Sequence, residues 1–450
     1  MNTLSSTLRN QLAVLTPQLT AWRRDLHSHP ETAWTEFRTA ALVARHLLDL
    51  GYTVRLGRQA LDPDFIGPLP DERALCAAQE RALREGADPE LVARMAGGYT
   101  ALWADLSCSG ASGPMLAFRF DMDANAMQES TEPRHRPYDA GFVSRHPGCM
   151  HACGHDGHTA LGLGLAALLI HIREYLRGSV RLIFQPAEEG GSGARPMLKA
   201  GALDGVEYLI GIHLGIRALY TGSVACGTKG FMASSGIDVR YTGSPAHAGL
   251  APHEGRNALL AACSAALGMY AITRHGDGSS RINVGQLQAG QARNVIPDSA
   301  ELKVETRGSS TEIDGFMLQE AERIARAAGD MWHCSCDIFP LKKLPGGASN
   351  SEMSARIARI ARAMPAFKNI VQEEAFGATE DFTVLLEAVQ QAGGQGTYIQ
   401  LGAERASGHH SDRFDFDESA LPLGLELLAR IALDYLQYLQ YDMGDAGGLL

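Results

Sequence analysis

The nine residues Met150–His158 constrain this chain more than any other segment. They read Met-His-Ala-Cys-Gly-His-Asp-Gly-His, so one thiol, three imidazoles and one carboxylate lie close together along the chain. Thiolates and imidazoles are good ligands for first-row transition metals, and the two glycines allow the backbone to turn sharply. Because sixteen histidines in 450 residues can also cluster by chance, a metal site requires further ligands from other parts of the chain.

Three other segments supply such ligands. Gln185–Gly190 contains two adjacent glutamates, Gly211–Leu214 contains one histidine, and Gly408–Ser411 contains two histidines. Each follows or ends an apolar run typical of a buried strand, and helical patterns lie between the strands, which predicts an α/β sheet. Such sheets bind ligands beyond the carboxyl ends of their strands. We therefore expect the four segments to meet there and to form the site of a metal-dependent hydrolase.

The number of candidate ligands favours two metal ions over one. Five ligands are too many for a tetrahedral zinc ion, which takes four, or three and a water. Two ions roughly 3.5–4 Å apart, sharing a thiolate or carboxylate bridge, fit this number better. Glu188 lies next to Glu189 and can act as the general base, although such a pair is more often a solvated surface feature. The candidate ligands are Cys153, His155, Glu189, His213 and His410.

The composition is that of an ordinary globular protein. A chain of 450 residues is too long for one compact core and favours two domains. The formal net charge of −11 argues against binding to nucleic acid or to an anionic membrane surface. We find no secretory signal and no uncharged apolar run of 18 residues, and the eight cysteines are scattered. These features favour a reducing cytoplasm.

A small domain inserted into a larger one is predicted from the order of the elements. The patterns in the second half of the chain give the order β-α-β-β-α-β, a ferredoxin-like split unit, between hinges at Gly227–Gly230 and Lys342–Gly347. The chain is expected to end in a helix, Leu421–Tyr441, and a loose tail, Gly444–Leu450. The expected boundaries are 1–228 and 344–450 for the catalytic domain, 58–97 for a flap inserted into it, and 229–343 for the inserted domain.

Three polar residues of the inserted domain are further candidates. His247 follows the first predicted strand, Asn294 lies in a loop, and Arg307 ends the third predicted strand. His247 can donate a hydrogen bond to an oxyanion, and Arg307 can clamp a carboxylate. Alternatively, His247 caps its own turn and Arg307 pairs with Glu305. The residues by themselves leave both alternatives open.

The motifs together resemble the M20 metallopeptidase family, in its amidohydrolase branch (subfamily D). The resemblance covers nearly the whole chain in order and implies a zinc-peptidase-like (phosphorylase/hydrolase-like) catalytic domain with an inserted dimerisation domain. One departure is Asp121–Ala126, which reads Asp-Met-Asp-Ala-Asn-Ala where the family usually has Asp-Met-Asp-Ala-Leu-Pro. The motifs are Cys153-Gly-His-Asp-Gly-His158, Gln185-Pro-Ala-Glu-Glu-Gly190, Gly211-Ile-His213, His410-Ser-Asp-Arg-Phe414 and, upstream, Arg119-Phe-Asp-Met-Asp-Ala124.

The resemblance also implies roles for the candidate residues. It implies two divalent metal ions, Mn or Zn, on the five ligands named above, with His410 preferred to His409 because the family histidine lies four residues before a phenylalanine, here Phe414. Glu188 matches the general base. His247 matches a histidine that completes the partner's active site in related dimers, and Asn294 and Arg307 match residues that hold the substrate carboxylate.

The implied activity is hydrolysis of an N-acyl amino acid into a carboxylic acid and an amino acid. The expected substrate is p-aminobenzoyl-glutamate, and a broader N-acyl-amino-acid or short-peptide deacylase is the alternative. A metal-binding subunit without turnover is disfavoured because Glu188 is present with a full set of ligands. The expected partner is a second copy of the chain or a paralogous subunit.

Overall fold

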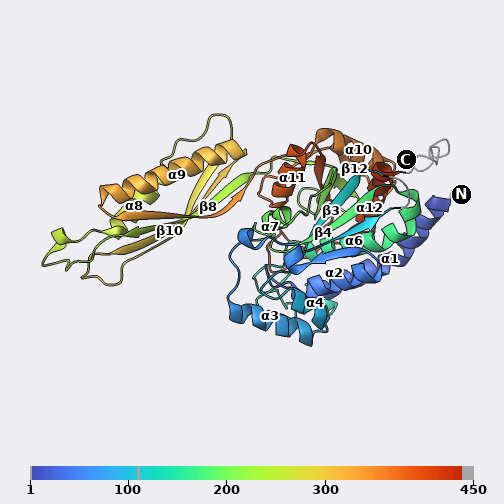
Figure 1. Ribbon diagram of the computed structural model, residues 1–450, viewed down its shortest axis with the longest axis horizontal. Helices are drawn as coiled ribbons and strands as arrows, with labels where there is room; N and C mark the ends of the chain where they lie inside the picture. Colours follow the sequence, from blue (N-terminus) through green and yellow to red (C-terminus); the bar gives the residue numbers. More distant parts are fainter. Residues whose placement is uncertain (1–2, 109–111, 438–450) are drawn as a thin grey trace. The chain divides into compact units, whose positions relative to one another are not determined.

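The computed structural model describes residues 3–108 and 112–437, which form two compact units (Figure 1). The first unit contains the described residues up to Lys229, then Ala348–Phe376 and those from Val384 onwards, and the second contains Gly230–Gly347 and Gly377–Thr383. The segment Gly377–Thr383 contacts the rest of the second unit through hydrogen bonds, such as the one from the Gly377 amide to the Gly230 carbonyl, 3.3 Å. The predicted tail, Gly444–Leu450, and the end of the predicted final helix lie outside the described residues.

An eight-stranded sheet forms the centre of the first unit, in the order β1-β2-β4-β3-β5-β14-β6-β12. Neighbouring strands from β4 to β14 are parallel, and these strands are buried almost throughout, as expected for a sheet covered on both faces. The strands are β1 Thr53–Leu56, β2 Leu102–Ser107, β3 Met115–Asp121, β4 Ser179–Gln185, β5 Tyr208–Leu214, β6 Ser223–Ala225, β12 Asn369–Val371 and β14 Gln395–Leu401.

Helix α6, His155–Ile172, is the central helix of this unit and contacts α1, α12 and β3. It is apolar nearly all round, which suits a helix enclosed by other elements. It begins at His155, because Gly154 adopts φ 91° and turns the chain into the helix. The other helices are α1 Thr3–Ser28, α2 Phe37–Asp49, α5 Arg136–Asp139, α7 Ala194–Lys199, α10 Ser351–Arg362, α11 Phe382–Gln391 and α12 Ala420–Leu436.

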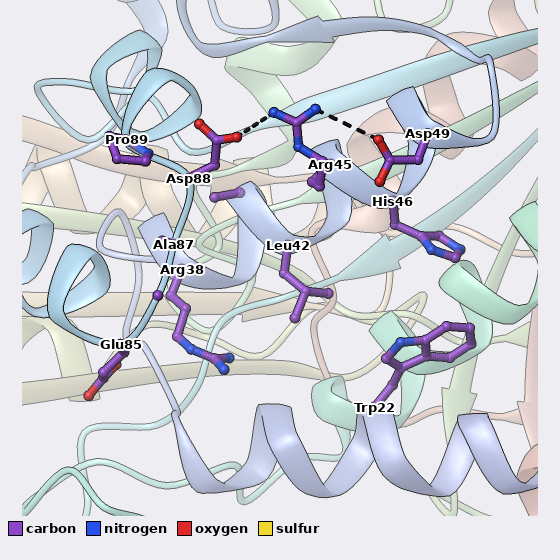
Figure 2. A pocket seen from close by; sticks show the side chains of 12 residues that line it. Trp22, Arg38, Leu42, Arg45, His46, Asp49, Glu85, Ala87, Asp88 and Pro89 are labelled. Carbon is purple, nitrogen blue, oxygen red and sulfur yellow. Dashed lines mark hydrogen bonds and ion pairs between the residues drawn. The ribbon is translucent and has the colours of Figure 1, made fainter.

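The insertion at 58–97 is not a free-standing flap. Its helices α3, Glu72–Arg84, and α4, Pro89–Arg94, bury apolar side chains in the main core beside those of α2. Figure 2 shows the pocket between α1, α2 and the α3–α4 loop, where Arg45 lies between Asp49 and Asp88. The sequence suggests a flap because the segment is rich in Pro, Asp and Glu, but Leu75, Leu91 and Val92 are among its apolar residues that pack in the core.

The second unit has the predicted β-α-β-β-α-β order. Its antiparallel sheet runs β11-β8-β10-β9, so β9 and β11 form its edges. Both helices pack against this sheet and against each other, and they enclose a separate apolar core. The elements are β8 Ala233–Thr242, α8 Ala258–Tyr270, β9 Ser280–Ala289, β10 Ser299–Gly308, α9 Thr311–Met331 and β11 Ser335–Leu344; a two-stranded ladder in the chain pairs β7 Thr228–Lys229 with β13 Glu374–Ala375.

None of the described helices has the length and apolar character needed to cross a membrane. All eight cysteines are free thiols.

A buried ion network joins α1 to the segment before α12. The Arg23 side chain is fully buried and contacts three carboxylates: Asp156 at 2.9 Å, Asp415 at 2.7 Å and Glu418 at 3.2 Å. Asp156 also accepts from His27, at 2.8 Å. Because Asp156 follows His155 at the start of α6, this network holds that end of the helix in place.

We predict that Arg23→Met lowers the free energy of unfolding by about 3–5 kcal/mol, because it removes the one fully buried cation that contacts all three carboxylates and leaves Asp156 without an arginine partner. Arg24→Met is the matched control. Arg24 also pairs with Glu418 but its side chain is 39% exposed, so its loss should cost less than about 1 kcal/mol. Urea denaturation measures both, and equal costs for the two variants would contradict the role given to Arg23.

Candidate metal centre

The side chains predicted to bind metal lie together at the carboxyl ends of the parallel strands. The ligand atoms of Cys153, His155 and Glu189 are all within 4.8 Å of one another. The Cys153 Sγ atom is 3.4 Å from Nε2 of His213, and Nε2 of His410 is 3.2 Å from Oε2 of Glu189. The structure therefore brings the five predicted ligands into one cluster, which we call the metal group. The sequence suggested that His213 comes at the end of a strand, just after its apolar run. In the structure His213 lies inside β5, one residue before the strand ends.

Two histidines of the metal group each use Nδ1 for a hydrogen bond to a backbone carbonyl, which leaves Nε2 for the metal group. The Nδ1 atom of His155 donates to the Asp123 carbonyl, 2.8 Å, and Nδ1 of His213 donates to the Leu214 carbonyl, 2.9 Å. In each neutral ring the Nε2 atom then carries the lone pair. Among the described residues, His155 Nε2 and Glu189 Oε1 are buried and make no hydrogen bond. Buried polar atoms are rarely left without partners, so these atoms fit a bound cation.

Two neighbouring histidines have no lone pair to offer. His158 donates from Nδ1 to Asp121, 2.5 Å, and accepts at Nε2 from the Leu214 amide, 2.9 Å. His409 accepts at Nδ1 from the Arg405 guanidinium, 2.5 Å, and donates from Nε2 to the Leu214 carbonyl, 3.1 Å. Burial, and next the charge of Arg405, lower the pKa of His409 to about 3, so this ring is neutral. These hydrogen bonds favour His410 over His409 as the last ligand.

The chemistry of the donors also fits a metal. Burial raises the pKa of the Cys153 thiol, so a thiolate there needs a cation beside it. Burial lowers the pKa of His213 well below its usual value, which keeps its ring neutral and able to coordinate. One thiol, three imidazoles and a carboxylate suit a first-row transition metal more than calcium or magnesium, which prefer oxygen ligands.

Two acidic residues that the sequence left without a role hold the loop that carries Glu188. Asp123 accepts from the amides of Glu188 and Glu189, at 2.9 and 3.0 Å, and Glu36 accepts from the amide of Ala187, at 3.0 Å. Ala187 has φ 55°, a conformation that a non-glycine residue keeps only when its surroundings fix it. Burial, and next the charge of Asp123, raise the pKa of Glu36 well above its usual value. Asp123 was visible in the Asp-Met-Asp motif, whereas no local pattern marks Glu36.

The departure from the family motif at residues 125–126 has a structural counterpart. The Asn125 side chain accepts a hydrogen bond from the Ala152 amide, 3.1 Å, and the Asn125 amide donates to the Met150 carbonyl, 2.9 Å. Asn125 therefore supports the backbone that leads into Cys153.

The three candidates in the second unit lie at two different places. The Ala248 amide donates to the Asn294 carbonyl, 3.0 Å, so His247 and Asn294 belong to adjacent loops at the end of the sheet where Thr242 faces Ser299. Arg307 faces Ser234 at the other end, where the chain enters and leaves the unit. Eight strand residues at roughly 3.4 Å each separate the two ends by about 27 Å. One copy of this unit therefore cannot direct all three side chains into a single site.

Both local alternatives considered for these residues occur in the structure. His247 accepts at Nδ1 from the amides of Gly249 and Leu250, each at 3.1 Å, and so caps its turn. This contact leaves the proton on Nε2, so the ring is still able to donate outward. The Arg307 Nε atom donates to Glu305, at 2.7 Å.

The fold and the metal group define a metal-dependent hydrolase acting on an amide bond. A model of the peptidase family M20/M25/M40 matches residues 117–434, and the chain belongs to this family. This result agrees with the resemblance inferred from the motifs.

Relatives with 44% identity cover almost all of the chain. One is the indole-3-acetyl-aspartic acid hydrolase of Enterobacter agglomerans, which aligns over 95% of this chain and 98% of its own length. Another is a subunit of the p-aminobenzoyl-glutamate hydrolase of Escherichia coli (strain K12), which aligns over 94% of this chain and 96% of its own length.

Solved structures agree with these relatives. The aminobenzoyl-glutamate utilization protein of Klebsiella pneumoniae superposes with a TM-score of 0.80 at 39% identity, covering 95% of this chain and 98% of that one. The Bacillus subtilis YXEP protein, a dinuclear metal-binding peptidase of the M20 family, gives a TM-score of 0.68 at 25% identity, covering 94% and 99%.

Three further sequence features resemble aminobenzoyl-glutamate utilization protein A, which is one of the subunits of p-aminobenzoyl-glutamate hydrolase. They are the insertion at 58–97, the start Trp22-Arg-Arg-Asp-Leu-His27 and the motif His135-Arg-Pro-Tyr138. The similarity to the Escherichia coli and Klebsiella pneumoniae proteins confirms this resemblance.

We predict that His410→Ala loses bound metal whereas His409→Ala keeps it, because both ring nitrogens of His409 are already used. Metal content per chain, measured by mass spectrometry after manganese loading and desalting, distinguishes the two variants. Loss of metal from His409→Ala with full retention in His410→Ala would reverse the assignment.

Proposed function

We propose that this chain hydrolyses p-aminobenzoyl-glutamate to p-aminobenzoate and glutamate, with Glu188 as general base. The observation that carries the proposal is the clustered donor set of the metal group, in which His155 Nε2 and Glu189 Oε1 are buried and unpaired, beside a second carboxylate that is not needed as a ligand. The similarity to the Escherichia coli hydrolase supports the substrate. The free thiols support a reducing compartment such as the cytoplasm, since Cys153 has to remain unoxidised.

The proposed ligands are Cys153, His155, Glu189, His213 and His410, and two divalent ions, Mn or Zn, fit their number. Bound there, such ions would polarise the scissile carbonyl and lower the pKa of the attacking water. Glu188 is suited to remove a proton from this water, because its Oε2 atom lies 3.9 Å from Nε2 of His155 and its backbone is held by Asp123. The same carboxyl group then returns the proton to the departing amine of the amino acid.

We predict that Glu188→Gln lowers kcat for p-aminobenzoyl-glutamate by roughly 10²–10⁴ while metal content stays unchanged. Glu189→Gln is the matched control, and it should lose metal as well as activity. The measurements are release of p-aminobenzoate by the manganese-loaded chain and metal analysis of each variant. Near-normal turnover by Glu188→Gln would refute its role as base, and absence of turnover by the wild-type chain with its partner subunit bound would refute the substrate.

We propose further that His247 and Asn294 serve the active site of a partner subunit, whereas Arg307 serves the site of its own chain. Support comes from their separation, since His247 and Asn294 lie at the end of the sheet that is remote from Arg307 and from the chain connections. At the partner's site the Nε2–H group of His247 would stabilise the oxyanion and Asn294 would bind the substrate carboxylate, whereas Arg307 would bind that carboxylate in the site of its own chain.

The second unit offers a surface for such a partner. Leu260, Leu267 and Tyr270 are exposed along one side of α8, with Leu267 75% exposed. Strand β9 is an edge of the sheet, so one row of its backbone groups is available to pair with another strand. An exposed apolar face beside an open strand edge is typical of an interface, and we propose that a second copy or a paralogous subunit binds there.

We predict that mixing His247→Ala with Glu188→Gln subunits restores activity, because one site of each hybrid dimer then has an intact base and an intact partner histidine. Arg307→Ala mixed with Glu188→Gln is the control and should give no rescue, since both groups act within one chain. Rescue in both mixtures, or in neither once subunit exchange is verified, would contradict the arrangement.

A further inference from the structure

Two arginines beside the metal group have no carboxylate partner among the described residues. Arg217 follows the end of β5, and Arg405 lies in the turn after β14. Other arginines of the first unit that lie near the metal group are paired: Arg119 with Asp121, and Arg23 with Asp156. We call Arg217 and Arg405 the arginine pair.

The position of Arg405 is fixed by its contacts. Its guanidinium donates to Nδ1 of His409, 2.5 Å, and the donor atoms of His409, Cys153 and His213 lie within 4.8 Å of one another. One imidazole ring therefore separates the guanidinium from the thiol. The stem of Arg405 runs along Gly215, where an added Cβ atom would meet its Cδ atom at 2.9 Å. A side chain at position 215 would push Arg405 away, so the glycine keeps it close to the metal group.

Among the described residues, no carboxylate forms an ion pair with Arg405. Burial lowers the pKa of Arg405, the charge of Cys153 raises it, and the charge of Arg217 lowers it. Arg217 is exposed and Arg405 is half-buried, and two guanidinium groups without a carboxylate partner favour an anion from outside. Guanidinium groups bind carboxylates well, through paired charge-assisted hydrogen bonds.

We infer that the arginine pair binds the side-chain carboxylate of an acidic amino acid in the substrate, and so selects N-acyl-glutamate or N-acyl-aspartate over neutral analogues. This inference rests on the proposed function and specifies its substrate class. An extended glutamyl side chain places its carboxylate roughly 5 Å from the scissile nitrogen, which suits a group one ring away from the metal ligands. The two relatives at 44% identity are named for different acyl groups, but the amino acid is acidic in both.

The test compares p-aminobenzoyl-glutamate, p-aminobenzoyl-glutamine and the α-amide of p-aminobenzoyl-glutamate on the same enzyme. For Arg217→Gln and Arg405→Gln, the ratio of kcat/KM for the glutamate over the glutamine substrate should fall about 10- to 100-fold. The ratio of kcat/KM for the glutamate substrate over its α-amide should stay unchanged. The glutamine side chain introduced by Arg405→Gln is still able to donate to His409, and any general loss of activity cancels in the two ratios. Arg413→Gln, in the same turn, is the control and should keep both ratios.

Unchanged ratios in both variants would overturn the inference, and so would a loss confined to the α-amide comparison, which would assign the pair to the α-carboxylate. A binding measurement separates this failure from failure of the proposed function. By calorimetry, the manganese-loaded chain should bind glutamate more tightly than glutamine, and Arg217→Gln should remove the difference. Tighter binding of glutamate without any hydrolysis would refute the proposed reaction but would still support the role of the arginine pair. Equal binding of glutamate and glutamine would overturn the inference that the arginine pair binds the side-chain carboxylate.

Discussion

The pairing of buried imidazole nitrogens is the constraint on which this active site depends. A buried ring has two nitrogens, and each needs a partner because an unpaired polar atom away from water is costly. The backbone of Leu214 pairs one nitrogen of each of three rings: its amide donates to His158, and its carbonyl accepts from His213 and His409. These contacts fix which nitrogen of His213 faces Cys153 and, together with Asp121 and Arg405, they remove His158 and His409 from the set of ligands.

The protein places these rings by using strand ends and one glycine. The parallel strands β3, β4 and β5 end beside one another, so Asp121, Gln185 and His213 come to the same edge of the sheet. Gly154 then turns the chain so that His155 is the first residue of α6. The buried salt bridges of Arg23 hold this helix end, and the amide contacts of Asp123 and Glu36 hold the Glu188 loop. A rigid surrounding of this kind preorganises the site.

Much of this arrangement follows from short-range sequence patterns, and the rest depends on contacts between distant residues. Apolar runs ending in polar residues predicted the central strands, and the motifs predicted which side chains meet. No local pattern marks Glu36, which reaches Ala187 across 151 positions of the chain, or the choice of hydrogen-bond partners that separates His409 from His410. The insertion at 58–97 was misjudged as a flap, because composition does not show which face of a short helix packs on the core. The separation of His247 from Arg307 also required the register of β8 and β10.

Anomalous diffraction from crystals loaded with manganese tests the central claim most directly. The account predicts two peaks roughly 3.5–4 Å apart, with Cys153, His155, Glu189, His213 and His410 as their protein ligands and with Glu188, His158 and His409 outside the coordination shells. A single peak, or a metal bound by His158 or His409, would contradict it.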